Sequence, residues 1–242
     1  MNNYLFYFNY FSNVPCKFNY LDLIKSIKDL KDKFIISTVD KADSNFAIMC
    51  KVLYRKLLLD EYLDCSKFKI LHSPLVIKNR ISAYGKKLKM NIPNYNFPYL
   101  FITTKFHKNP VKFRYVTCGT SAYNKNATNY FFSLLNKILN VISKEDSNKV
   151  INNNSPVLDI FKVDSIHINS VNTYDFENLF GSIPHNNIIA VCETIYEEYS
   201  SILDCDRDYW INLVKFCIFE NILYNGSDYF LQIKGIPMGS SF

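Results

Sequence analysis

The chain has 242 residues, a formal net charge of +6 and a hydrophobic content of 48%. This length allows one large domain or two smaller ones, and the apolar content excludes an intrinsically disordered chain. No apolar run is long enough to cross a bilayer, so no membrane-spanning segment is expected. The moderate positive charge permits a polyanionic partner without requiring one.

The cysteines and histidines show no pattern of a structural metal site or a disulfide framework. The seven cysteines form no Cys-x-x-Cys pair, and the four histidines lie far apart in the sequence. A structural zinc site is therefore not expected, and reduced thiols indicate an intracellular protein. Arginine is rare beside lysine, which makes Arg114, inside an apolar strand pattern, a candidate for a specific role.

Apolar periodicity predicts helices and two pairs of strands in the first 150 residues. The predicted helices cover residues 21–30, 52–63 and 122–142, with further helical pieces in residues 68–92. The predicted strands cover residues 34–39, 46–50, 97–103 and 112–118. The connection between the last two strands is basic and turn-forming. The polar stretch at residues 148–156 is the best candidate for a domain boundary or a flexible loop.

The second part of the chain is predicted to begin with a strand over residues 166–173. The turn Gly181-Ser-Ile-Pro then opens a helix predicted over residues 188–203. A second helix is predicted over residues 209–224, and a last strand over residues 229–233.

The basic connection is the first stretch that carries chemistry. It holds four fixed cations, one histidine and no acid, and the cations are Lys105, Lys108, Lys112 and Arg114. A basic hairpin can lie across phosphates, and arginine offers planar bidentate donors to phosphate oxygens. The alternative is a solvated basic loop.

Asp175, at the end of the predicted strand, is the second such feature. A hard divalent cation prefers carboxylate oxygen, so Asp175 is a candidate metal ligand. The aromatic Phe180 follows five residues later. The alternative is an aspartate that only caps a turn.

The stretch Gly235-Ile-Pro-Met-Gly-Ser-Ser is the third. Its glycines would let the backbone approach a planar ligand closely, and exposed amides at a helix start favour a phosphate. The alternative is a tight turn into a helix.

The order of these three stretches resembles that of a template-dependent polymerase of the reverse-transcriptase type. The resemblance is closest to the reverse transcriptases of Penelope-like retroelements, which are related to telomerase reverse transcriptase, and it covers the chain from about residue 35 to its end. Thr104-Lys-Phe-His-Lys resembles the family's Pro-Lys-x-His-Lys, and Phe113-Arg-Tyr-Val resembles Leu-Arg-Pro-Ile. The stretch from Asp175 to Pro184 resembles Asp-Val-x-x-Leu-Tyr-Thr-Asn-Ile-Pro. The remaining matches are Asp40-Lys41, Tyr54 and Leu231-Gln-Ile-Lys-Gly-Ile-Pro-Met-Gly-Ser, which resembles Gln-x-x-Gly-x-x-Met-Gly.

The resemblance implies an α+β fold of right-hand polymerase architecture with fingers and an incomplete palm. Residues 1–150 would be an N-terminal extension and the fingers region, and residues 151–242 a partial palm of the reverse-transcriptase domain. The complete enzyme would add deoxynucleoside triphosphates to a DNA primer on an RNA template with two magnesium ions (Mg2+), and it would be nuclear.

The resemblance also assigns roles to single residues. Asp175 would be a catalytic carboxylate that binds metal together with the Phe176 carbonyl. Phe180 would pack under the incoming sugar and exclude a 2′-hydroxyl. Lys105 and Arg114 would bind the triphosphate, with Lys108 as the alternative. Lys108 and Lys112 would also bind nucleic acid, and the nucleotide and template side would be lined by Gln232, Gly235, Met238 and Gly239. For Asp40 and Lys41, a structural ion pair and a substrate contact both remain open.

Two departures from the family pattern bear on activity. The family places an aromatic-x-Asp-Asp turn after the Met-Gly-Ser stretch, and no Asp-Asp pair occurs in these 242 residues. Thr104 also replaces the family's proline. The chain by itself is therefore expected to be inactive or nearly so. The alternatives are a catalytically dead nucleic-acid-binding remnant of such an element, and a fold that keeps the basic hairpin for structural reasons.

Overall fold

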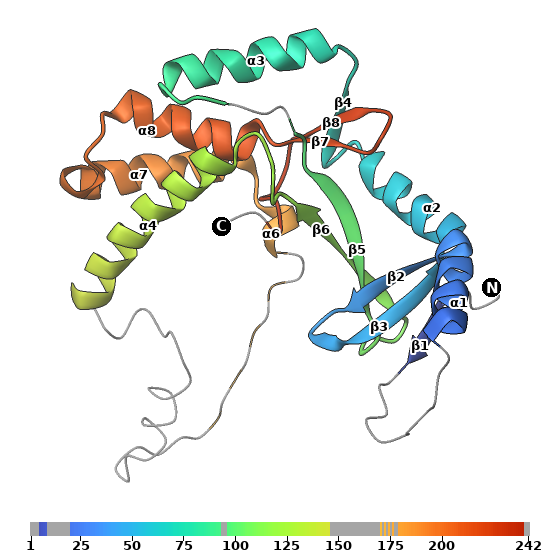
Figure 1. The fold of residues 1–242 in the computed structure, drawn as a ribbon. Helices are drawn as coiled ribbons and strands as arrows, with labels where there is room; N and C mark the ends of the chain where they lie inside the picture. Colours follow the sequence, from blue (N-terminus) through green and yellow to red (C-terminus); the bar gives the residue numbers. More distant parts are fainter. Residues whose placement is uncertain are drawn as a thin grey trace.

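The computed structural model describes residues 5–8, 20–92, 96–145, 170, 172, 174, 176 and 179–239. The fold is mixed α+β, as the sequence predicts. Figure 1 shows the helices α3, α4, α7 and α8 gathered at one end of the molecule, and a sheet with the helices α1 and α2 at the other. A second, smaller sheet lies between these two parts. The predicted strand over residues 166–173 and the boundary at residues 148–156 fall outside the described residues.

The larger sheet has five strands in the order β1-β3-β2-β5-β6. The strands are β1 (Leu5–Phe8), β2 (Phe34–Val39), β3 (Ala42–Cys50), β5 (Tyr99–Lys105) and β6 (Lys112–Cys118). Both predicted strand pairs are confirmed as antiparallel, and β2 joins β5 in parallel at Val39 and Thr104. β3 begins earlier than predicted, because a tight turn at Asp40-Lys41, with a left-handed Lys41 (φ 59°), returns the chain at once.

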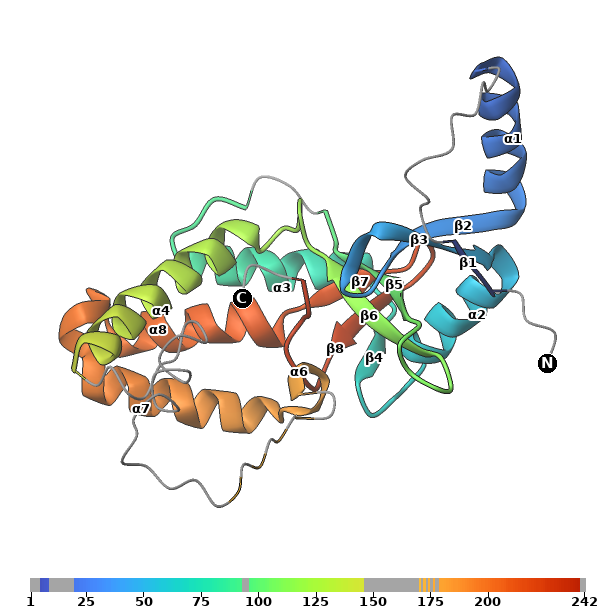
Figure 2. The same ribbon diagram turned by 90° about the horizontal axis from the view of Figure 1, so that it is seen from below.

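Two helices belong to this half of the molecule. The helix α1 (Tyr20–Lys33) confirms the prediction and stands away from the sheet in Figure 2. The helix α2 (Lys51–Tyr62) runs along β5, where two tyrosine hydroxyls accept amide hydrogen bonds. The Leu100 amide donates to Tyr62 Oη at 2.8 Å, and the Ile102 amide donates to Tyr54 Oη at 3.2 Å. The two hydroxyls thus satisfy amides of β5 beyond its pairing with β2.

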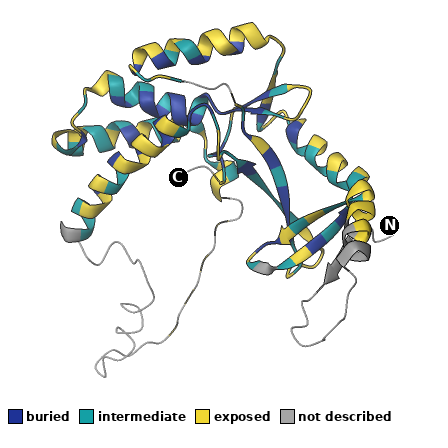
Figure 3. Cartoon of the chain, in the orientation of Figure 1, coloured by how far each residue is buried: buried dark blue, intermediate teal, exposed yellow. Residues whose placement is uncertain are grey.

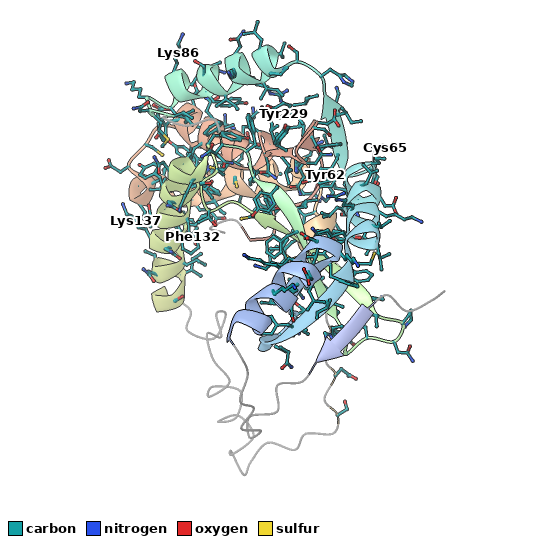
Figure 4. All side chains as sticks on the ribbon, turned by 45° about the vertical axis from the view of Figure 1, so that its right-hand side comes forward. Tyr62, Cys65, Lys86, Phe132, Lys137 and Tyr229 are labelled. Atoms are coloured by element: carbon teal, nitrogen blue, oxygen red, sulfur yellow. The ribbon has the colours of Figure 1, made fainter. Side chains whose placement is uncertain are left out.

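The smaller antiparallel sheet has the order β4-β8-β7. Its strands are β4 (Phe68–Leu71), β8 (Tyr229–Gln232) and β7 (Ile222–Tyr224). The prediction was wrong for β7, which lies in the helix expected over residues 209–224, and β4 was not predicted as a strand within residues 68–92. Their apolar runs fit a helix as well as a strand, and pairing with β8 decides for the strand. Figure 4 labels Tyr62, whose ring packs 4.6 Å from that of Phe230 on β8 and so joins α2 to this sheet.

The helical part holds the main hydrophobic core. Its helices are α3 (Pro74–Lys87), α4 (Lys125–Glu145), α7 (His185–Leu203), α8 (Arg207–Val214) and the π-helix η1 (Lys215–Phe219). Figure 3 shows that buried residues are frequent on α8 and on the inner sides of α4 and α7. The core includes Ile77, Phe131 and Leu134 as well as Trp210 and Leu213, so residues before and after position 150 share it. Among the described residues no helix is long and apolar enough to cross a membrane.

The buried carboxylate of Glu220, just after η1, links this core to α3. Arg80 Nη2 donates to Glu220 Oε1 at 2.8 Å, and Arg80 Nε also pairs with the carboxylate. The Tyr123 hydroxyl donates to the Glu220 carbonyl and accepts from the Ile222 amide. Burial raises the pKa of Glu220, and Arg80 opposes that shift.

Arg80→Ala is expected to lower the free energy of unfolding at pH 7 by about 2 kcal/mol. A buried unpaired carboxylate costs about 3–5 kcal/mol, and the 42% exposure of the Arg80 side chain reduces that figure. Without Arg80 the pKa of Glu220 rises further, so the stability of the variant is lost as pH rises through that pKa. Urea denaturation should therefore show a smaller loss at pH 5 than at pH 7.

Arg207→Ala is the control for this experiment. Arg207 pairs with Glu193 at 2.8 Å, but both side chains are largely exposed, so a loss below about 0.5 kcal/mol is expected. An equal loss in both variants would contradict the structural role given to the Arg80–Glu220 pair.

Candidate functional site

A cleft of about 840 Å³ lies between the β5–β6 hairpin, the short helix α6 (Leu179–Ser182) and the chain that follows β8. Seven cations line it, and Glu61 is the acid that lines it among the described residues. The cations are Lys41, Lys67, Lys105, Lys108, Lys112, Arg114 and Lys234. The cleft therefore carries a clear excess of positive charge, which attracts an anionic ligand.

The hairpin supplies the largest group of these cations. Lys105 pairs with Lys112 across the two strands, and Thr103 pairs with Arg114, so these side chains share one face of the hairpin. Burial, and then the positive charge of Arg114, lowers the pKa of Lys105, with smaller contributions of the same sign from Lys108 and Lys112. A bound anion would relieve this repulsion between neighbouring cations.

Arg114 also forms an ion pair with Asp40. Its Nη1 donates to Asp40 Oδ1 at 2.6 Å, and the Asp40 amide donates to the Thr104 carbonyl at 3.0 Å. The Asp40 side chain is 6% exposed, whereas that of Arg114 is 31% exposed. Of the two roles left open by the sequence for Asp40, the structure contains the ion pair.

Two exposed aromatic side chains also line the cleft. Phe176 is 76% exposed, Phe180 in α6 is 47% exposed, and both line the cleft. Large aromatic side chains left open to solvent beside a row of cations offer stacking surfaces for bases or sugars. The predicted positions Phe176 and Phe180 thus lie in the same cleft as the basic hairpin.

The chain after β8, residues 235–239, forms a loop that joins the two walls. The Gly235 amide donates to the Ile183 carbonyl at 2.9 Å, and the Ile236 amide donates to the Phe180 carbonyl at 2.6 Å. At its other end the Met238 carbonyl accepts from the Thr117 amide of β6, also at 2.6 Å. The loop places Met238 in the lining of the cleft.

The two glycines of this loop serve a purpose that the sequence did not predict. Gly235 has φ +79°, and a Cβ there would lie 2.6 Å from the Phe180 carbonyl oxygen. Gly239 has φ +95°, and its Cβ would lie 2.6 Å from the Thr117 oxygen. Among the described residues, the close approach is therefore to the protein's own backbone, with α6 on one side and β6 on the other.

Gln232 lines the cleft, but its amide is bonded at both ends within the chain. Its Oε1 accepts from Asn221 Nδ2 at 2.7 Å, and its Nε2 donates to the Lys234 carbonyl at 2.9 Å. The side chain thus supports the start of the loop and places Lys234 beside the cleft.

The sequence did not single out His185, the first residue of α7. Its Nε2 donates to the Gly235 carbonyl at 2.8 Å, and its ring stacks on Phe219 with centroids 4.6 Å apart. Burial lowers the pKa of His185, so the neutral ring is favoured. The sequence signal that could have identified His185 is its position directly after the Gly-Ser-Ile-Pro turn.

The predicted metal ligand Asp175 lies outside the described residues. Within the described part of the chain, no group of three or more His, Cys, Asp or Glu residues could hold a metal ion. Glu61, on the wall of the cleft, pairs with Lys67 at 2.9 Å. Magnesium binding is therefore expected only from the family resemblance, which implies Asp175 and the Phe176 carbonyl as ligands.

Comparison with known proteins adds no assignment. The chain matches no protein-family model, no curated protein and no solved structure. The residues that line the cleft therefore carry the functional argument.

Proposed function

We propose that this chain is the fingers region and part of the palm of an RNA-directed DNA polymerase of the retroelement type. Its cleft would bind the triphosphate of an incoming deoxynucleotide and the phosphates of an RNA template with its DNA primer. One observation carries this proposal. Three stretches that the sequence marks separately, the basic hairpin, the aromatic pair and the loop at residues 235–239, contribute to one cleft.

The chemistry of the lining suits a nucleotide. The cations of the hairpin neutralise phosphate charge, and the guanidinium of Arg114 fits two phosphate oxygens at once. The side chains of Phe176 and Phe180 line the same cleft and are exposed enough to contact a base or a sugar. A polyanion without bases would use the cations and leave the aromatic wall unused.

The second candidate is a nucleic-acid-binding remnant without polymerase activity. The cleft supports it as well, because its cations and exposed aromatic side chains suffice for binding without chemistry. The two candidates share the cleft and its phosphate contacts. They differ in the activity of the complete protein: a polymerase extends the primer with magnesium, whereas a remnant does not at any magnesium concentration.

Salt-dependent binding tests what the two candidates share. A fluorescein-labelled DNA primer annealed to an RNA template should bind with a slope of log affinity against log salt of about −3, since the hairpin offers four cations. Fluorescence anisotropy between 50 and 200 mM salt, about the range where counterion release is informative, gives this slope. Absence of binding at the lower salt would overturn both candidates. Binding by these 242 residues supports both, and primer extension by the complete protein would then distinguish the polymerase from the remnant.

Phe180→Ala is expected to reduce discrimination against ribonucleotides. If Phe180 packs under the sugar, its removal opens space for a 2′-hydroxyl, and the preference for dATP over ATP should fall about tenfold. Competition of the two nucleotides for the cleft, with template and primer present, measures the ratio. In an active polymerase the same change should raise ribonucleotide incorporation.

Phe132→Ala is the matched control, because Phe132 is a partly exposed phenylalanine on α4, labelled in Figure 4, and does not line the cleft. It should leave the dATP-to-ATP ratio unchanged. An unchanged ratio in Phe180→Ala would contradict the role given to Phe180 and leave the phosphate contacts standing.

A further inference from the structure

We infer that the Asp40-Lys41 turn takes part in nucleotide binding in the cleft. This inference rests on the proposed function. Asp40 is a positioning residue that holds the guanidinium of Arg114 ready for the triphosphate. Lys41, the next residue, is a further phosphate-binding residue.

The turn brings two neighbouring side chains of opposite charge to different places. Asp40 is buried against Arg114, whereas Lys41 is exposed and lines the cleft. The hydrogen bond from the Asp40 amide to the Thr104 carbonyl fixes the turn on β5, next to Lys105. The left-handed backbone of Lys41, with φ 59°, is part of the same tight turn. Such a conformation is costly for lysine and indicates that the surroundings impose it.

The ion pair leaves donors of Arg114 for a ligand. Asp40 takes one hydrogen bond, from Nη1, and Nε is buried, so the donors left for a ligand are those of the two terminal nitrogens. A guanidinium has five N–H donors in one plane. A single carboxylate can therefore fix its orientation while other N–H donors remain for a ligand. Arg114 also lines the cleft, so the held group is available there. Preorganisation of this kind strengthens binding because less side-chain freedom is lost.

The direction in which Asp40→Asn changes triphosphate affinity distinguishes a positioning role of Asp40 from a simple effect of its charge. Asp40→Asn removes a negative charge beside the cleft, so charge alone predicts tighter binding of a triphosphate. Loss of positioning predicts weaker binding instead. Asp60→Asn is the matched control, since it makes the same change of residue type and net charge on the exposed surface of α2, away from the lining of the cleft.

The experiment is isothermal titration of dTTP into the whole chain loaded with template and primer. We expect about tenfold weaker binding for Asp40→Asn and unchanged or slightly tighter binding for Asp60→Asn. Lys41→Asn should weaken binding about threefold and reduce the salt slope by about 1. Asparagine is chosen there because it tolerates a left-handed backbone. In the Arg114→Gln background, Asp40→Asn should not change the dTTP affinity further, because Asp40 acts by orienting the guanidinium of Arg114.

The outcomes separate this inference from the function on which it rests. If the unchanged chain binds dTTP and folded Asp40→Asn binds as tightly or more tightly, the positioning role is wrong and the proposed function stands. If the unchanged chain does not bind dTTP, the nucleotide site itself is wrong. Should Asp40→Asn unfold, Asp40→Glu replaces it, since it keeps the charge and moves the carboxylate. Weaker binding by Asp40→Glu supports positioning, and unchanged binding overturns it.

Discussion

Gly235→Ala is expected to detach the loop at residues 235–239 from α6. The substitution places a Cβ 2.6 Å from the Phe180 oxygen at a position with φ +79°. A left-handed backbone costs alanine about 1–2 kcal/mol, and the clash adds about as much, for a total near 3 kcal/mol. The amides of Gly235 and Ile236, which bond to α6 and the turn after it, should then exchange hydrogen about a hundredfold faster. Hydrogen exchange followed by mass spectrometry of peptides from this region measures the change.

Gly226→Ala controls for the backbone contribution alone. Gly226 has φ +104°, but a Cβ there would meet nothing within 4 Å. It should therefore show the cost of the left-handed conformation, about 1 kcal/mol, without the clash. Equal effects at Gly226 and Gly235 would show that the packing of the loop against Phe180 adds nothing.

The double substitution Lys105→Gln and Arg114→Gln should weaken binding of template and primer at least a hundredfold. Each residue contributes a phosphate contact worth about 1–3 kcal/mol, and Arg114 loses its planar fork as well. The salt slope should become shallower by about 2, because two counterion-releasing contacts are gone. Anisotropy at several salt concentrations measures both quantities.

Lys86→Gln together with Lys137→Gln is the matched control for charge. Both lysines are exposed, on α3 and α4 respectively, and Figure 4 shows them on the outside of the molecule. This variant loses the same net charge without touching the cleft, so affinity should change less than about threefold. If both double variants weaken binding equally, the effect belongs to net charge, and the cleft is not the binding site.

The basic hairpin was predictable because its signals are local. Apolar runs bounded by turn residues define β5 and β6, and the turn composition of the connection indicates their antiparallel pairing. Once that register holds, Lys105, Lys112 and Arg114 must share one face of the hairpin, and Lys108 lies in the connecting turn. The α-helices of the core were predictable in the same way, since their apolar spacing persists over several turns.

Features that depend on distant partners were not predictable. The segment of β4 has no distinctive period, and β8 pairs with it from far away in the sequence. β7 pairs with β8 as a close hairpin, but its residues continue the apolar spacing of the helix before it. The glycines at 235 and 239 indicated a close backbone approach, but not whether a ligand or the chain itself makes it. Whether Asp40 faces a ligand or Arg114 depends on the parallel contact between β2 and β5, which no local pattern specifies.

The loop at residues 235–239 also determines how the cleft can open. It is anchored to α6 at Ile236 and to β6 at Met238. Two residues of chain span at most about 7 Å, so the anchors cannot move further apart while both hydrogen bonds hold. The walls are therefore tethered at the Thr117 end of the hairpin, while the basic tip has no such restraint from this loop. A rotation of the hairpin about this pivot widens the cleft and keeps both bonds, and it moves Lys105 and Lys108 through a larger arc than Thr117.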